Sequence, residues 1–387
     1  MSATSRRVHL LVLLGALAAC EPPAGKDASE ERLAPAGADG LVVPPARDEV
    51  TLTATDEADD LFPALAGDDL VWVRVEPDRE VARGDQEIDC FACVGCSTCR
   101  WSVMHRRLPD GEERVVWSGR WVAGAPTVDD GLVTFIDGDN VVRLVDLASL
   151  ATERIHPPSY LGRGPLVREG LVWWYAWDGH VGGQAMVAWD PTLPGVVTRV
   201  RADANEMSFV PNGTVGAVGR RQPFALDGAR LVWASHTTGG GVVNVADLGT
   251  GDRSEALVDA QRAHLTPLVV GDTIVTLAYD LADSCYEARC ELSLERIQGG
   301  AATPLAPDAQ PTVYLPPVSD GRRVAWVDRR DGPYMIVGVD VAAGGDERRL
   351  SSEDARVGVV SRLAFDDGRL VWSDRRTGRW RLVMRRW

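Results

Sequence analysis

The residues best suited to chemistry in this 387-residue chain are its cysteines, and four of the seven stand at equal three-residue spacing. The run comprises Cys90, Cys93, Cys96 and Cys99. Thiolates so arranged bind zinc or an iron-sulfur cluster, or they pair as disulfides. Ferredoxin runs have three residues before their last cysteine and a proline after it, whereas here two residues precede Cys99 and Arg100 follows. Zinc sites draw ligands from two separated pairs, which one short run does not supply.

Another cysteine, Cys20, ends an apolar segment near the N-terminus. Arg6 and Arg7 precede apolar residues 10–19, which is the layout of a secretory signal peptide and too short to cross a bilayer. Residues 17–20 read Leu-Ala-Ala-Cys and match the bacterial lipobox. This resemblance implies cleavage after a signal peptide at residues 1–19, lipidation of Cys20 and stable anchoring in the bacterial cell envelope. Glu21, where an inner-membrane retention signal typically has Asp, favours the outer membrane.

Assigning Cys20 to a lipid leaves an even number of cysteines in a compartment that favours disulfides. We therefore expect disulfides among Cys90, Cys93, Cys96, Cys99, Cys285 and Cys290. A metal or redox module built on Cys90, Cys93, Cys96 and Cys99 remains an alternative. No cofactor is expected otherwise.

The elements that must position these residues begin after a tether. Residues 20–48 are rich in Ala, Pro, Gly, Asp and Glu with almost no aromatic residue, which predicts a flexible linker. Residues 49–387 are too long for one ordinary core but suit a repeat architecture. The formal net charge of −15 argues against nucleic acid as a partner, because phosphate binding needs clustered basic residues.

Seven copies of one unit follow each other along residues 49–387. Each copy has a short apolar stretch, an acidic-Gly turn and a β-branched or aromatic run. A proline precedes the apolar stretch in the first six copies. The runs end at Trp72, Thr134, Trp173, Trp233, Thr276, Trp326 and Trp372. Spacings of 39, 43 and 46 residues between equivalent positions fit four strands per unit, as in a propeller blade, whereas the gaps of 62 and 60 residues, from Trp72 to Thr134 and from Trp173 to Trp233, require insertions. We predict an all-β, seven-bladed β-propeller of four-stranded antiparallel blades.

Three further expectations follow from this architecture. The seven Trp and Thr positions fill the space between blades. The N-terminal strand at residues 49–55 completes the last blade, which leaves no open edge in the ring. The cysteine-rich run lies in an insertion at about residues 76–100 that lengthens the first unit.

The units also carry a family resemblance. Residues 319–326 and 328–332, and their echo at 367–372 and 374–378, resemble the WD-repeat-like units of TolB-like propellers. The resemblance covers about 340 residues and is carried by packing and turn positions. It implies the fold strongly and a function only weakly.

Local motifs for catalysis are missing from the sequence. It contains no G-x-S-x-G elbow, H-E-x-x-H or G-x-x-x-x-G-K-[ST] motif, and its six histidines lack ligand spacing. The segment from Asp137 to Asn140 reads as a hairpin turn rather than half a calcium loop. The acidic residues between Asp56 and Asp60 read as a solvated loop.

The sequence thus predicts a non-enzymatic lipoprotein that presents its propeller to protein or glycan partners. Two alternatives stay open. One is a propeller enzyme, a glycoside hydrolase or lyase, with carboxylates gathered at the channel mouth from several blades. The other is the metal or redox module based on the four-cysteine insertion.

Overall fold

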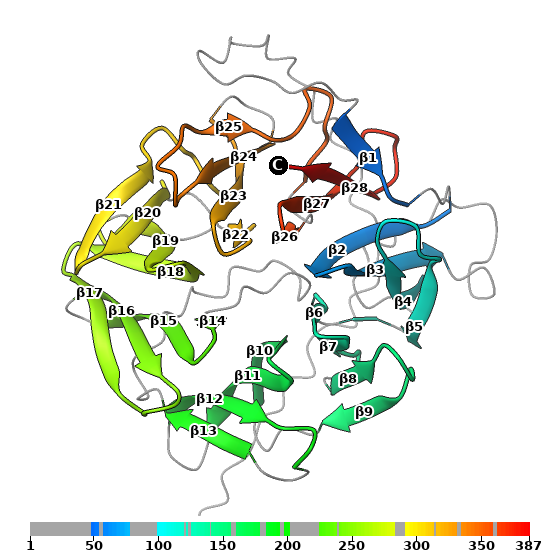
Figure 1. Cartoon of the computed structure of the whole chain (residues 1–387), viewed down its shortest axis with the longest axis horizontal. Coiled ribbons are helices and arrows are strands. Elements are labelled where there is room, and N and C mark those ends of the chain that lie inside the picture. The colour runs from blue at the N-terminus through cyan, green and yellow to red at the C-terminus, as the bar shows by residue number, and fades with distance from the viewer. Residues whose placement is uncertain are drawn as a thin grey trace, which may run out of the picture. The chain divides into compact units, whose positions relative to one another are not determined.

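The structure is a computed structural model that describes residues 48–387 except for 54–56, 78–98, 120, 123–124, 140, 156–159, 179–182, 194–196, 202–223, 238–239, 283–290, 313–314, 331–333 and 359–361. Seven four-stranded antiparallel sheets follow one another around a common axis (Figure 1). The seven-bladed propeller predicted from the repeats is confirmed. The described part contains no helix that could span a membrane.

The first four blades each take four consecutive strands. Blade 1 contains β2 (Asp59–Ala66), β3 (Asp69–Pro77), β4 (Cys99–Arg107) and β5 (Arg114–Gly119). Blade 2 contains β6 (Thr127–Asp129), β7 (Leu132–Ile136), β8 (Val142–Asp146) and β9 (Thr152–Ile155). Blade 3 contains β10 (Tyr160–Arg168), β11 (Leu171–Asp178), β12 (Gly183–Trp189) and β13 (Val197–Arg201). Blade 4 contains β14 (Phe224–Asp227), β15 (Arg230–Thr237), β16 (Gly240–Asp247) and β17 (Arg253–Asp259).

The last three blades include the closure of the ring. Blade 5 contains β18 (Arg262–Val270), β19 (Thr273–Asp280), β20 (Ser293–Gln298) and β21 (Ala301–Ala306). Blade 6 contains β22 (Val318–Ser319), β23 (Arg323–Asp328), β24 (Met335–Asp340) and β25 (Arg348–Arg349). Blade 7 contains β26 (Ala364–Asp366), β27 (Arg369–Asp374) and β28 (Arg381–Arg386), and its outermost strand is β1 (Glu49–Thr51) from the other end of the chain.

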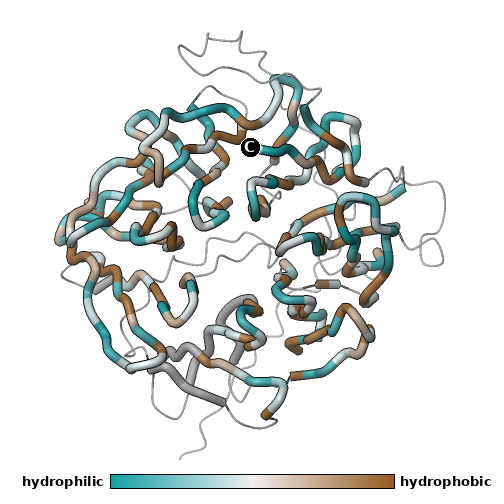
Figure 2. The backbone as a smooth tube through the Cα atoms, in the orientation of Figure 1, coloured by the Kyte–Doolittle hydropathy of each residue, from teal (hydrophilic) through white to brown (hydrophobic). Residues whose placement is uncertain are grey.

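The hydrophobic core is divided among the spaces between blades. Seven clusters of buried side chains join blade 1 to 2, 2 to 3 and so on around to 7 and 1. All seven repeat positions are buried, with Trp72, Thr134, Thr276, Trp326 and Trp372 at 0% exposure. The prediction that they fill the interblade space is therefore confirmed. In the coloured parts of Figure 2, hydrophobic and hydrophilic stretches alternate along the sheets, as blades with apolar faces and polar turns require.

The acidic-Gly turns join the first and second strands of the blades. At Asp130 and Gly131 both φ angles are positive, 45° and 73°, as in the type I′ turn that favours Gly at its second position. The amide of Leu147, in the turn after the third strand, donates to the carbonyl of Gly131 at 2.8 Å. Both kinds of turn therefore share one end of the ring, which we call the hairpin face. The second strand of each blade finishes at the opposite side of the ring. The connection from the preceding blade enters the first strand on this same side, which we call the linker face.

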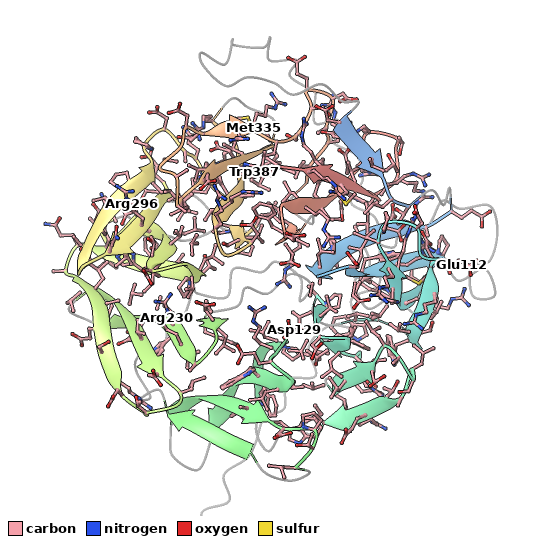
Figure 3. All side chains as sticks on the ribbon, viewed as in Figure 1. Glu112, Asp129, Arg230, Arg296, Met335 and Trp387 are labelled. Carbon is pink, nitrogen blue, oxygen red and sulfur yellow. The ribbon has the colours of Figure 1, made fainter. Side chains whose placement is uncertain are left out.

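Polar contacts at the hairpin face tie neighbouring blades together. Asp129 of blade 2 accepts a hydrogen bond from the amide of Glu169 in blade 3, at 2.6 Å. Asp366 of blade 7 accepts one from the amide of Gly67 in blade 1, also at 2.6 Å, and Arg369 donates to the carbonyl of Gly67 at 2.6 Å. In Figure 3, Asp129 lies toward the centre of the ring, whereas Glu112 and Arg296 lie near its rim.

Candidate functional site

The cysteines singled out by the sequence mostly lie outside the described residues. Cys20, Cys90, Cys93, Cys96, Cys285 and Cys290 are among these. Cys99 begins β4 opposite Pro77 at the linker face and is 3% exposed. The pairing within the group stays a prediction. Where the chain is described, no group of three or more His, Cys, Asp or Glu side chains could hold a metal ion.

The segment at Asp137 is a hairpin turn, as predicted. The Oδ1 of Asp137 accepts hydrogen bonds from the amides of Asp139 at 2.9 Å and Val141 at 3.0 Å. Arg143 donates from Nε to the Oδ2 at 2.6 Å. The carboxylate therefore holds the turn between β7 and β8 and pairs with the guanidinium beside it.

The prediction of a solvated loop for the acidic residues between Asp56 and Asp60 is wrong for Asp59 and Asp60. Both belong to β2, and their exposures are 9% and 0%. The Nε1 of Trp72 donates to Asp60 Oδ1 at 2.8 Å, and Arg74 donates to both carboxylate oxygens at 2.8 and 3.1 Å. Arg74 also reaches Glu113, just before β5, at 2.8 Å. The acid is buried because an arginine and an indole compensate its desolvation.

Blade 6 repeats this arrangement with its acid on the second strand. Asp328 is fully buried, and its Oδ2 accepts from Trp326 Nε1 at 2.8 Å and from Arg330 Nη2 at 2.7 Å. Arg330 Nη2 also contacts Glu347, just before β25, at 2.5 Å. We call this combination of Trp, Asp, Arg and Glu a brace, because its arginine spans the blade from the second strand to the fourth.

Blade 7 builds its brace from both ends of the chain. Trp372 Nε1 donates to Asp374 Oδ2 at 3.3 Å, and Arg376 contacts the same oxygen through Nη2 at 2.5 Å. The glutamate is Glu49 of β1, whose Oε2 lies 2.7 Å from Arg376 Nη2. Glu49 also accepts from the amide and the hydroxyl of Ser352, at 2.7 and 2.9 Å. The closing strand therefore supplies the group that Glu113 and Glu347 supply in blades 1 and 6.

The electrostatics of the braces keep their arginines charged. Desolvation by burial would lower the pKa of Arg376, but its hydrogen bonds and charge interactions with Asp374 and Glu49 outweigh that effect and raise the pKa. The pKa of Arg330 is raised for the same reasons by Asp328 and Glu347. A brace thus stabilises permanent charges, which suits structural cross-linking better than proton transfer.

A cleft of about 140 Å³ adjoins the brace of blade 7. Its lining residues are Glu49, Thr51, Asp374, Arg376, Thr377, Arg381 and Val383. Hydroxyl, carboxylate and guanidinium groups line this space together, so it offers donors and acceptors for a hydroxyl-bearing group. The cleft lies beside β1, β27 and β28, and none of its lining residues was singled out for chemistry by the sequence.

The arginines of blades 6 and 7 are a feature that the sequence reasoning missed. Residues 311–387 contain 15 arginines and 11 acidic residues, although the whole chain has 56 acidic and 41 basic residues. Arg356 and Arg375 are exposed neighbours at the linker face, with the amide of Arg375 donating to the carbonyl of Arg356 at 3.1 Å. Counting charges segment by segment, rather than over the whole chain, would have revealed this concentration.

Two histidines are buried in separate blades. His105 lies between Asp69, 2.8 Å from Nε2, and Arg114, whose Nε donates to Nδ1 at 2.9 Å. His264 is fully buried, and its Nδ1 lies 3.0 Å from the hydroxyl of Thr276. Desolvation by burial lowers the pKa of both histidines. Arg114 requires Nδ1 of His105 to be an acceptor, so Nε2 carries the proton that binds Asp69.

Comparisons with known proteins identify architecture only. The sequence matches no protein-family model and no curated protein. Among solved structures, the β-propeller domain of the Trilobed protease from Pyrococcus furiosus shares 11% identity, with 86% of this chain and 94% of that chain covered and a TM-score of 0.57. That domain is described as having an open velcro topology, whereas β1 closes the ring here.

Two further solved structures extend the comparison. An oligogalacturonate lyase in complex with manganese shares 11% identity over 87% of this chain and 92% of that chain, with a TM-score of 0.53. TolB from Acinetobacter baumannii shares 15% identity over 66% of this chain and 62% of that chain, with a TM-score of 0.43. At these identities the shared feature is the β-propeller fold alone.

Proposed function

We propose that the chain is a lipid-anchored protein of the bacterial envelope, in the outer membrane, whose propeller is a rigid binding platform for protein or glycan partners. The observation that carries this proposal is the attachment of β1. This strand follows the expected tether, and it pairs with β28 while Glu49 bonds both Arg376 and Ser352. A pull on the tether would therefore be transmitted to blade 7 through backbone pairing and the brace.

The use made of the carboxylates supports a binding role. Asp60, Asp328 and Asp374 each accept hydrogen bonds from an indole and an arginine, so they stabilise blades rather than wait for substrate. A ring whose blades are held in this way presents its two faces with little reorganisation. Preorganised surfaces lose less conformational entropy when they bind.

The anchor is tested by fractionating cells that produce the full chain or its Cys20→Ala variant. We expect the unaltered chain in the outer-membrane fraction, with a mass increased by acyl chains, and the variant in the soluble or uncleaved fraction. Equal distribution of the two chains, with no added mass on the unaltered one, would show that Cys20 is not an anchor.

The platform is tested by cross-linking in intact cells, followed by purification of the chain and identification of covalently attached protein or glycan. We expect one specific partner class that is absent from a control chain lacking the propeller. Recovery of no partner would contradict the proposal. Turnover of a glycan by the purified chain would replace the platform with the enzyme alternative.

A further inference from the structure

We propose that the linker face of blade 7 binds a carboxylated glycan, with Arg362 as the innermost contact and Arg356 and Arg375 as outer contacts. The inference rests on the proposed function as a binding platform, and it names the chemical class of the partner. It is drawn from the positions and the partners of these three arginines.

The first step concerns Arg362, which precedes the inner strand of blade 7. The strand register of blade 7 can be matched to that of blade 5, because Ala364 pairs with Val371 as Leu268 pairs with Val275. Two residues before these positions, Arg362 in blade 7 corresponds to Thr266 in blade 5. First strands surround the axis of the ring (Figure 1). Arg362 therefore lies at the inner edge of its blade, toward the linker face.

The second step concerns the partners of Arg362. It is partly exposed, and it forms no hydrogen bond or ion pair within the described residues. The surrounding protein nevertheless desolvates it enough to lower the pKa of its guanidinium to about 10. A charge that is desolvated without compensation costs free energy, and such costs concentrate at functional sites, where a ligand supplies the compensation.

The third step concerns the outer arginines. The backbone of Arg356 is clamped, because its amide donates to Asp374 at 3.1 Å and its carbonyl accepts from the amide of Arg375. The side chains of Arg356 and Arg375 are exposed and make no ion pair in the described part of the chain. Asp354, the nearby acid, is already bound by Arg376 and Ser352. Both arginines are thus fixed at their backbones, and Arg375 also donates from Nε to the carbonyl of Gly378 at 3.3 Å, which leaves the terminal guanidinium nitrogens of both open to an anion.

Blade 6 shows that this arrangement is not required by the fold. The amide of Arg329 donates there to the carbonyl of Gln310, and the amide of Gln310 donates to Asp328. The clamp is the same, but Gln310 stands where blade 7 has Arg356. Because the backbone makes the clamp, the arginine side chain is free for another role.

The fourth step concerns the class of ligand. Arg356 lies in the linker, Arg362 just before the inner strand β26 and Arg375 just after β27, so the three contacts come from separate segments, which suits a polymer with several carboxylates better than a single anion. The adjoining cleft offers the hydroxyls of Thr51 and Thr377 to sugar hydroxyls.

The test measures binding of an oligoglucuronate to the full-length chain and to three variants by calorimetry. We expect Arg362→Gln to weaken binding at least about tenfold, as loss of a charged hydrogen bond does. Arg356→Gln, which gives blade 7 the residue of blade 6, should weaken it severalfold. The control Arg296→Gln, at the rim of blade 5 (Figure 3), should leave it unchanged.

Thermal unfolding of the same variants separates a binding role from a structural one. Removing a desolvated, uncompensated charge should leave the Tm of Arg362→Gln unchanged or raise it. A clearly lower Tm would show that Arg362 serves the fold and would overturn the proposal. Equal binding by a neutral oligoglucan of the same length, or by inorganic phosphate, would also overturn it.

Failure of the glycan inference can be told apart from failure of the proposed binding platform. If cross-linking recovers a protein partner while oligoglucuronate does not bind, the platform stands and the glycan inference fails. If neither experiment finds a partner, both fail.

Discussion

At the scale of single residues, the braces show how this chain places charges in its interior. Asp328 is fully buried, yet it is stabilised by Trp326 and Arg330, so its charge is compensated on two sides. Burying a charge is tolerated only with such compensation, and removing one partner leaves the other uncompensated. The braces should therefore be sensitive to substitution in a way that surface ion pairs are not.

We expect Asp328→Asn to lower the free energy of unfolding by about 3 kcal/mol, because Arg330 would lose its main counter-charge. Urea denaturation of the purified chain measures this change. The matched control is Glu76→Gln, which breaks the exposed contact between Glu76 and Arg100. That substitution should cost less than about 1 kcal/mol. Equal effects of the two substitutions would show that burial does not decide the strength of these pairs.

The buried histidines predict a loss of stability in mild acid. Burial holds the pKa of His105 below 6.5, and the positive charges of Arg114 and Arg107 lower it further. Asp69 acts in the opposite direction but does not outweigh these effects. The unfolded chain therefore binds more protons than the folded chain between the folded pKa and 6.5. The resulting contribution to stability is complete above pH 6.5 and decreases as the pH falls through that window.

We expect the unfolding free energy of the unaltered chain to decrease between pH 7 and 5 more steeply than that of His105→Gln. The variant keeps hydrogen-bonding capacity at this position and lacks the titrating ring. His264 remains in both proteins and contributes the same slope to each, because desolvation also lowers its pKa. Parallel pH profiles for the two proteins would contradict the assignment of a neutral His105.

At the scale of elements, β1 is short for the role it has. Only three of its residues pair with β28, although Leu52 donates to the carbonyl of Leu382 at 2.8 Å and Thr53 accepts from the Leu382 amide at 3.0 Å. Glu49 adds the brace, and Asp48 adds a contact with Arg385 at 2.9 Å. Side-chain contacts thus compensate for the small number of ladder hydrogen bonds.

Deleting residues 49–53 should lower the Tm by at least about 5 °C, because blade 7 loses its fourth strand and Arg376 loses Glu49. Differential scanning calorimetry measures this shift. A control that removes residues 36–40 from the preceding Ala-, Pro- and Gly-rich segment should leave the Tm unchanged. An unchanged Tm after the first deletion would mean that the ring is stable without this closure.

At the scale of the whole molecule, the cysteines connect the expected compartment to chemistry. If Cys20 is lipidated outside the cytoplasm, the remaining six cysteines meet an oxidising environment. We expect mass mapping under non-reducing conditions to find three disulfides and no free thiol, and elemental analysis to find no metal. Stoichiometric zinc or iron together with free thiols would instead support the metal or redox module.

The sequence by itself determined the number of blades, because the acidic-Gly turn and the buried Trp or Thr recur in every unit. It also located the second strand of each blade, because each apolar run ends inside one, as Trp72 does in β3 and Trp372 in β27. These are local patterns, set by turn geometry and by the alternation of apolar residues along a strand. The pattern Trp-x-Asp-x-Arg at residues 326–330 and 372–376 was likewise visible in the chain.

Only the tertiary structure decided which charges are buried and which are open. Asp59 and Asp60 look like part of a solvated run until Trp72 and Arg74 are brought against them. Glu49 is separated by more than 300 residues from Arg376, and ring closure alone makes them partners. Local composition carries no information about such contacts, because compensation of a buried charge depends on what the rest of the fold places beside it.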